Sequence, residues 1–190
     1  MLTKTSRFGV VSRTISISLL SAAFALPTYA QKTTELPAGG GGSAHVRREW
    51  VVAPANISIE YGRPTLKKRD ELVLMKEKPE WRTGADAASI ITTDKALKFG
   101  DVTLQPGTYT INTASTGNSW QILFGKLGKK GQWGIPYQKD LEIGRAPMKA
   151  GKTASSVEAV TFLIEPGKSA GTLKIEWGNT SLSVPFTVLP

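Results

Sequence analysis

The sequence predicts an all-β protein: a single antiparallel β-sandwich, with a jelly-roll-like or barrel-like sheet as the alternative. Three observations lead to this fold class. Short runs of alternating apolar and polar residues recur along the chain, turn-forming residues separate them, and only residues 67–78 have room for a short helix, which Pro79 limits. Eight or more short strands without crossover helices favour antiparallel pairing.

Residues 1–30 have the three parts of a secretory signal peptide. Cations within the first 13 residues precede an apolar run over residues 15–26, and small residues ending at Ala30 follow it. The run is too short to span a bilayer and no second one follows, so we expect no transmembrane segment in the mature chain. The sequence therefore predicts export, with a periplasmic or extracellular location after cleavage near Ala30.

Residues 31–43 are predicted to be a flexible, glycine-rich tether. They hold almost no apolar side chain and include the four consecutive glycines Gly39–Gly42. We therefore expect this segment to be disordered and dispensable for folding, and the β-sandwich domain to cover residues 44–190.

The predicted strands begin after this tether. Their inward-facing side chains in the first half of the domain are predicted to be Ile57, Ile59, Tyr61, Leu97, Phe99, Val102, Leu104, Tyr109, Ile111, Trp120, Ile122 and Phe124. Gly100-Asp101 offers a two-residue hairpin turn between two of these strands, and Pro106-Gly107 makes the next turn.

The C-terminal strands are the most regular. Alternating apolar series cover residues 160–164, 173–177 and 182–188. Pro166-Gly167 separates the first series from the second, and Gly178-Asn179 separates the second from the third. Both dipeptides are typical of turns, so we predict three strands, of which the last two form a terminal hairpin.

Composition limits the partners and the source of stability. The chain has 24 Lys and Arg against 15 Asp and Glu, a formal net charge of +9, and +6 remains without the three cations of the signal peptide. No nucleic-acid-binding motif accompanies this charge, so we expect no nucleic acid and consider an anionic or carbohydrate envelope ligand. The absence of cysteine predicts an ordinary core without disulfides.

Residue types used in catalysis are scarce. There is no cysteine nucleophile, and His45 is the only histidine. Its surroundings show neither a nucleophile-elbow spacing nor a second histidine for zinc, so we expect no metal and no cofactor. We interpret His45 as a hydrogen-bonded residue at the start of the first strand, while a single-histidine site completed by carboxylates stays open. No carboxylate pair has a spacing that indicates glycoside hydrolysis.

Residues 80–89, EWRTGADAAS, gather an indole, a guanidinium and a carboxylate around one glycine. Gly84 and the β-type run after it argue against a helix, so we predict a turn that enters a strand. There Arg82 can offer its planar fork to Asp86 or to backbone carbonyls, while Trp81 shields the pair from water. The same groups would also bind a ligand carboxylate or phosphate, and both interpretations remain.

Four motifs occur one after another along the mature chain. They are Tyr61-Gly62-Arg63-Pro64 with Lys67 and Arg69 after it, Trp81-Arg82-Thr83-Gly84-Ala85-Asp86, Leu104-Gln105-Pro106-Gly107-Thr108-Tyr109-Thr110, and Gly131-Gln132-Trp133-Gly134. In this order they resemble the domain of unknown function 2911 (DUF2911), a family of secreted bacterial proteins. The resemblance runs from about His45 to Phe186 and implies no established activity. Lys68 and residues 71–80 depart from the family pattern.

These observations favour a non-catalytic exported domain that binds a ligand or partner in the bacterial envelope. The residues predicted to bind it are Arg63, Trp81, Arg82, Asp86, Trp133 and His45. The alternative is a hydrolase or metal-assisted enzyme that acts on an envelope polymer, using His45 and Asp86 with Arg82 as electrostatic stabiliser. A structure that separates His45 from Asp86 would remove this alternative.

A basic surface is a further hypothesis. If the fold brings residues 63–69 to the glycine-rich loop 125–134, their cations and Trp133 would form a basic, aromatic-edged concavity suited to an anionic ligand. Scattered lysines such as Lys129 and Lys130 are more often separate solvated charges.

Overall fold

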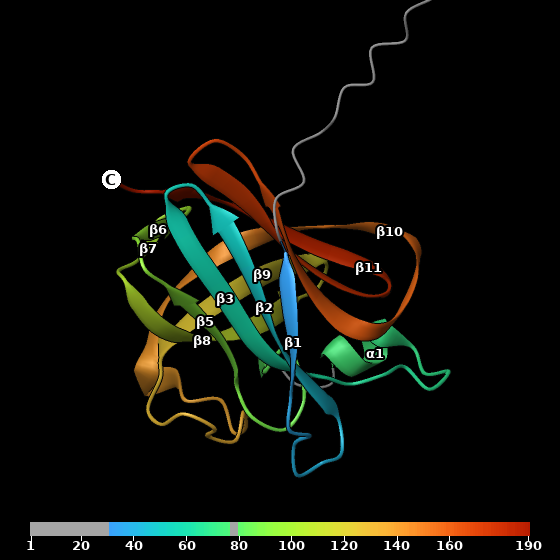
Figure 1. Ribbon diagram of the computed structural model, residues 1–190. Helices are drawn as coiled ribbons and strands as arrows, with labels where there is room; N and C mark the ends of the chain where they lie inside the picture. The colour runs from blue at the N-terminus through green and yellow to red at the C-terminus, as the bar shows by residue number, and fades with distance from the viewer. Residues whose placement is uncertain (1–30, 77–79) are drawn as a thin grey trace, which may run out of the picture.

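Antiparallel strands hydrogen-bond into one open sheet, which confirms the all-β prediction (Figure 1). This computed structural model describes residues 31–76 and 80–190, so the predicted signal peptide lies outside the described residues. The strands are β1 (Lys32–Leu36), β2 (Ala44–Val52), β3 (Ala55–Arg63), β4 (Glu80–Trp81), β5 (Ser89–Thr93), β6 (Leu97–Phe99), β7 (Val102–Leu104), β8 (Gly107–Thr116), β9 (Ser119–Lys126), β10 (Glu142–Pro166) and β11 (Ala170–Val188).

The strand order is β1-β2-β3-β5-β8-β9-β10-β11-β6-β7, and β4 pairs with β8. Among the described residues, helical structure is confined to α1 (Glu71–Lys76), inside the range predicted for a short helix, and the 3-10 turn η1 (Lys139–Leu141). No helix in the described ranges is long and apolar enough to cross a membrane.

The sheet packs on itself because β10 is long enough to belong to both halves. Its first part pairs with β9 and its later part pairs with β11. The halves meet through aromatic contacts: the rings of Tyr61 and Phe162 lie edge to face with centroids 4.7 Å apart, and Phe99 lies 4.7 Å from Phe124. One continuous folded sheet thus builds the core that the sequence assigned to a sandwich.

The predicted inward face is buried. Among the inward-facing residues predicted for the first half of the domain, those with no exposed surface are Ile59, Leu97, Phe99, Leu104, Ile111, Ile122 and Phe124. Trp120 and Trp177 are 4% and 3% exposed, which confirms them as core, whereas Tyr109 is only partly buried.

The turn predicted at Gly178-Asn179 is wrong. β11 continues through these residues, and Gly178 has a φ of 57° opposite Val157, where the β10–β11 register shifts. A glycine that adopts this φ fits a bulge as well as a turn, because both need left-handed backbone. The terminal hairpin is therefore β10–β11, with its turn after Pro166.

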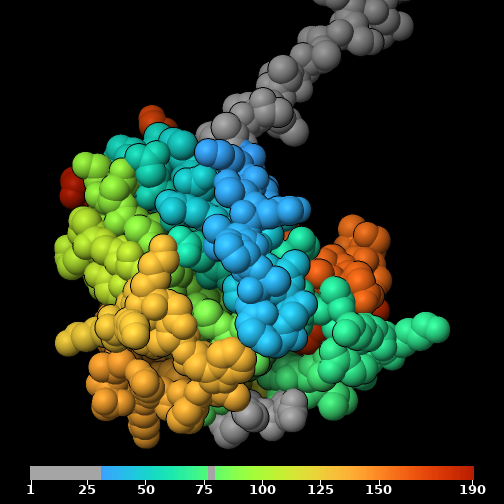
Figure 2. All heavy atoms as spheres, turned by 60° about the horizontal axis from the view of Figure 1, so that its bottom comes forward, coloured from blue at the N-terminus to red at the C-terminus, as the bar shows by residue number. Residues whose placement is uncertain are grey.

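The disordered tether predicted for residues 31–43 is also wrong for its first half. Residues Lys32–Leu36 form β1, which pairs with β2 at the edge of the sheet, from Lys32 opposite Glu49 to Leu36 opposite His45. Figure 2 shows this blue segment crossing the surface of the domain. Main-chain pairing holds β1 while its side chains stay largely exposed, so an argument from apolar composition could not detect it. That the segment is dispensable for folding stays a prediction.

Candidate functional site

Three of the four motifs meet around the loop over residues 82–88. The amide of Gly134 donates to the carbonyl of Asp86 at 3.1 Å, which joins the loop to the GQWG motif. On the other side, a Cβ at Gly62 would lie 2.3 Å from the carbonyl oxygen of Ala85. Glycine at position 62 therefore lets β3 and the loop approach more closely than any side chain would allow.

His45 and Asp86 form a buried polar pair. His45 Nε2 lies 3.1 Å from Asp86 Oδ2, and the two side chains are 11% and 6% exposed. Asp86 has a φ of 62°, a left-handed conformation that aspartate tolerates better than most residues. The enzyme alternative required His45 to lie near Asp86, and the structure meets this condition.

Two glycines of the N-terminal segment lie directly over this pair. A Cβ at Gly39 would be 2.2 Å from Asp86 Oδ2 and 2.5 Å from His45 Nε2, and one at Gly41 would be 2.1 Å from Asp86 Oδ1. Real Cβ contacts are far longer, so a side chain at either position would push the N-terminal segment away from the pair. The glycine run provides close approach here rather than chain flexibility.

Arg82 does not pair with Asp86, contrary to the structural pair expected in the turn that enters the strand. Among the described residues no hydrogen bond or ion pair joins the two, and the carboxylate of Asp86 contacts His45 instead. The Arg82 guanidinium lies over Trp133, with Cζ 5.2 Å from the ring centroid, and Nε donates to the Gly84 carbonyl at 3.4 Å.

The guanidinium of Arg82 is incompletely satisfied. Its Nη1 is buried and has no hydrogen-bond partner within the described part of the chain. Burial lowers the pKa of Arg82, and the charge of Asp86 acts in the opposite direction. Arginine nevertheless keeps its proton in proteins, so this side chain is a partly desolvated cation.

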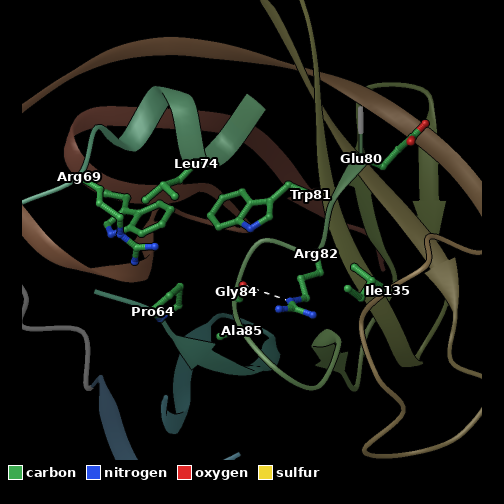
Figure 3. Close-up of a pocket in the computed structure, with 10 residues that line it drawn as sticks. Pro64, Arg69, Leu74, Glu80, Trp81, Arg82, Gly84, Ala85 and Ile135 are labelled. Carbon is green, nitrogen blue, oxygen red and sulfur yellow. Dashed lines mark hydrogen bonds between the residues drawn. The ribbon is translucent and has the colours of Figure 1, made fainter. Parts of the chain in front are cut away.

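Arg82 borders a pocket of about 170 Å³, here called the Arg82 pocket (Figure 3). Its lining residues are Pro64, Arg69, Leu74, Glu80, Trp81, Arg82, Gly84, Ala85, Ile135 and Trp177. Trp81 and Trp177 stack with ring centroids 5.5 Å apart and planes 11° apart. Arg69 is held by the carbonyls of Leu66 and Thr65. The pocket thus combines stacked indoles with two guanidinium groups.

The structure does not bring every predicted site residue to this pocket. Arg63 lies elsewhere: its Nε donates to the Val160 carbonyl at 3.1 Å and its Nη2 to Thr161 Oγ1 at 3.2 Å, which fastens β3 to β10. Of the cations in the hypothesised basic surface only Arg69 lines the Arg82 pocket, and Lys130 lies 3.8 Å from a Glu60 oxygen.

A polar cluster that the sequence argument missed anchors the loop carrying Trp133. Glu142 accepts from Arg145 Nε at 2.6 Å and Nη2 at 2.7 Å, and Tyr137 Oη donates to it at 2.5 Å. The hydrogen bonds from Arg145 lower the pKa of Glu142. Burial raises the pKa of Tyr137 most, and the hydrogen bond to Glu142 raises it further. Glu142 and Arg145 meet because the β10–β9 register shifts between Glu142 and Gly144. The alternation of apolar and polar residues in the sequence does not reveal this shift.

We expect Glu142→Gln to lower the melting temperature at pH 7 by about 3–12 °C, since a charge-assisted hydrogen bond contributes ~1.5–3 kcal/mol. The folded-state pKa of Glu142 is lowered, so its stabilisation is present above the unfolded-state pKa and lost as pH falls through the folded-state pKa. The gap between variant and wild type, measured by calorimetry, should therefore close below about pH 4.

Glu165→Gln is the matched control. Glu165 pairs with Lys174 but is 62% exposed, so its loss should hardly change melting at either pH. A Glu142→Gln gap that stays constant from pH 7 to pH 3 would contradict the assigned role.

Comparison with known proteins identifies the family of the chain. A family model described as a protein of unknown function (DUF2911) matches residues 43–186. Comparisons with curated proteins and with solved structures give no match. The matched range contains the Arg82 pocket and the His45–Asp86 pair, but β1 and Gly39–Gly42 lie outside it.

Proposed function

The chain belongs to the DUF2911 family, and from the geometry of its shared motifs we propose that the domain binds a small organic anion in the Arg82 pocket. The single observation that carries this proposal is the buried Nη1 of Arg82, which finds no acceptor within the described residues. A buried donor of a charged group without an acceptor is costly, and a carboxylate or phosphate group would supply the hydrogen bond that Nη1 lacks.

The rest of the pocket favours an anion with an apolar or planar body. Trp81 and Trp177 present stacked indoles, and Leu74 and Ile135 add aliphatic surface. Aromatic faces pack well on planar or ring-shaped ligands, while the guanidinium fixes the charged end. Trp133 covers Arg82 from the outside, where it is 52% exposed.

The proposed setting is the bacterial envelope. The features of residues 1–30 support export, and exported domains meet anionic and carbohydrate polymers there. The ligand in this proposal is therefore a carboxylate- or phosphate-bearing envelope component, bound without covalent chemistry.

Tryptophan fluorescence tests the proposal, because Trp81 and Trp177 line the pocket and Trp133 lies against Arg82. We expect saturable quenching by benzoate and phenyl phosphate, and none by the uncharged benzamide. Arg82→Gln should weaken benzoate binding by at least ~10-fold, since a charge-assisted hydrogen bond is worth ~1.5–3 kcal/mol. Arg82→Lys should weaken it too, because an ammonium lacks the planar fork.

Arg47→Gln is the matched control, because it removes the same charge from β2 at a residue outside the pocket lining. Its benzoate affinity should equal that of the wild type. Equal benzoate affinity in wild type and Arg82→Gln, or saturable binding of benzamide as tight as that of benzoate, would refute anion binding by Arg82.

A second candidate is a hydrolase that acts on an envelope polymer, favoured by the 3.1 Å contact between His45 and Asp86. A carboxylate beside an imidazole orients the ring and stabilises its cation, as a general base requires. Within the described residues no group of three His, Cys, Asp or Glu side chains could hold a metal ion. Release of soluble fragments from purified cell-wall polymer, lost in His45→Gln with benzoate binding intact, would favour this candidate.

A further inference from the structure

The strand at one edge of the sheet is bound almost entirely through its main chain. β1 lies at the end of the strand order and pairs only with β2 among the described strands. Residues Lys32–Glu35 are exposed, and the ion pair of Lys32 with Glu49 spans 3.8 Å between side chains that are 75% and 35% exposed. Such a pair contributes little, so backbone hydrogen bonds hold this strand, as in peptide recognition by strand addition.

Beyond β1 the segment enters a notch that accepts only residues without side chains. The notch consists of His45 and Asp86, and Gly39 and Gly41 sit on it at distances that leave no space for a Cβ. Neither glycine has a left-handed φ, unlike Gly42 at 79°. Glycine is therefore needed at these two positions because a Cβ would collide with the notch, and not because the backbone is left-handed.

A cavity remains between the segment and the domain. It measures about 410 Å³, and Leu36 and Pro37 line it on one side, with His45, Tyr61 and Lys130 among the residues on the other. The exposed Lys130 borders this space, so it is a groove that opens to solvent rather than a void in the core. A peptide with a bulkier side chain than Leu36 or Pro37 would fit the same groove.

The segment also lies outside the range that the family model matches. The family match begins at residue 43, after β1 and the glycine run, whereas β2, His45 and Asp86 all lie within it. The edge of β2 is thus the outer edge of the matched domain, and exposed strand edges readily accept another strand.

From these observations we propose that the edge of β2 and the notch at His45 and Asp86 form a binding groove for an extended polypeptide, and that residues 32–42 occupy it in this chain. The partner is a peptide strand followed by a turn with glycine at the two positions that contact Asp86. Main-chain pairing provides most of the affinity, the notch selects glycine, and the cavity selects an apolar side chain beside it. This groove is separate from the Arg82 pocket and does not depend on its ligand.

The test uses the full mature chain and a dye-labelled synthetic peptide of residues 31–43, followed by fluorescence anisotropy. In the wild type the tethered segment competes at a millimolar effective concentration, so peptide binding should be weak. Gly39→Ala with Gly41→Ala disables the tethered segment while leaving the groove intact. We expect this variant to bind the peptide at least ~10-fold more tightly than the wild type.

A peptide that carries the same two alanines is the control, and it should bind neither protein. No gain of peptide binding in the doubly substituted chain, or equal binding of both peptides, would overturn the proposal. Circular dichroism and thermal melting first establish that the variant folds.

Hydrogen exchange on the wild type tests the groove even if the variant fails to fold. Amides of residues 33–36 should exchange at least ~10-fold faster than those of β3, through local opening of β1 from β2. Exchange of these amides only at the rate of global unfolding would show that the groove never opens, and the proposal would be wrong.

Discussion

Gly62→Ala should lower the melting temperature of the domain by about 6–12 °C, corresponding to a loss of ~3 kcal/mol. The new Cβ would lie 2.3 Å from the carbonyl oxygen of Ala85 and 2.8 Å from His45 Nε2. The first of these atoms belongs to a backbone that cannot rotate away. Relief requires β3 and the 82–88 loop to separate, which disturbs the packing of three motifs at once.

Gly151→Ala is the matched control, because Gly151 also lies in a strand but a Cβ there would meet its nearest atom at 3.9 Å. Calorimetry should show little change or a small gain in stability for this variant. Benzoate binding should also weaken in Gly62→Ala, since Gly84 and Ala85 line the Arg82 pocket. A Gly62→Ala protein that melts like the wild type would show that the two backbones can move apart at little cost.

Most of the strands could be predicted because burial with a period of two leaves a direct record in the sequence. Ile57, Ile59 and Tyr61 illustrate this: all three are buried in β3, as their alternation predicts. β1 leaves no such record, since its pairing relies mainly on the main chain and four of its five side chains are exposed. A Gly-Asn dipeptide likewise marks left-handed backbone but does not say whether the strand turns back or continues through a bulge, as β11 does at Gly178.

The members of the candidate site were easier to predict than their contacts. Arg82, Asp86, Trp133 and His45 all lie in or against the 82–88 loop, but of these four only Arg82 lines the Arg82 pocket. An Arg82–Asp86 pair was expected in the turn, whereas Asp86 binds a histidine 41 residues away. That contact depends on the β2–β3 register and on the left-handed φ of Asp86. Neither can be predicted from the residues next to Asp86 in the sequence. Arg63 was predicted to bind the ligand because it belongs to one of the motifs. In the structure its guanidinium joins β3 to β10.

The glycine run was interpreted as a flexible linker, but in the structure it makes a close contact. Four consecutive glycines are typical of flexible linkers, and nothing in Gly39–Gly42 itself distinguishes a linker from a close contact. The distinction lies in Asp86, far along the chain, whose carboxylate occupies the space that a side chain at Gly39 or Gly41 would need. A glycine run next to a buried polar pair is therefore better interpreted with the tertiary contacts in view.

Asp86 should prove to be more strongly coupled to His45, which it contacts, than to Arg82, on which it acts only through its charge. Asp86→Ala leaves the imidazole without its buried partner and removes a residue that tolerates a φ of 62°, so it should destabilise the fold by ~2–3 kcal/mol. Asp86→Asn keeps both the hydrogen-bonding capacity and the tolerance for this φ, so its cost should stay below ~1 kcal/mol.

Two double-mutant cycles, measured by urea unfolding, separate the partners of Asp86. The His45→Ala and Asp86→Ala cycle should give a coupling energy of ~1–2 kcal/mol, because each single change already removes the 3.1 Å contact. The Arg82→Ala and Asp86→Ala cycle should stay within ~0.5 kcal/mol of additivity, since among the described residues no hydrogen bond or ion pair joins these side chains. If the second coupling exceeds the first, Asp86 serves Arg82 after all, and the buried His45–Asp86 pair is not the contact that fixes the 82–88 loop.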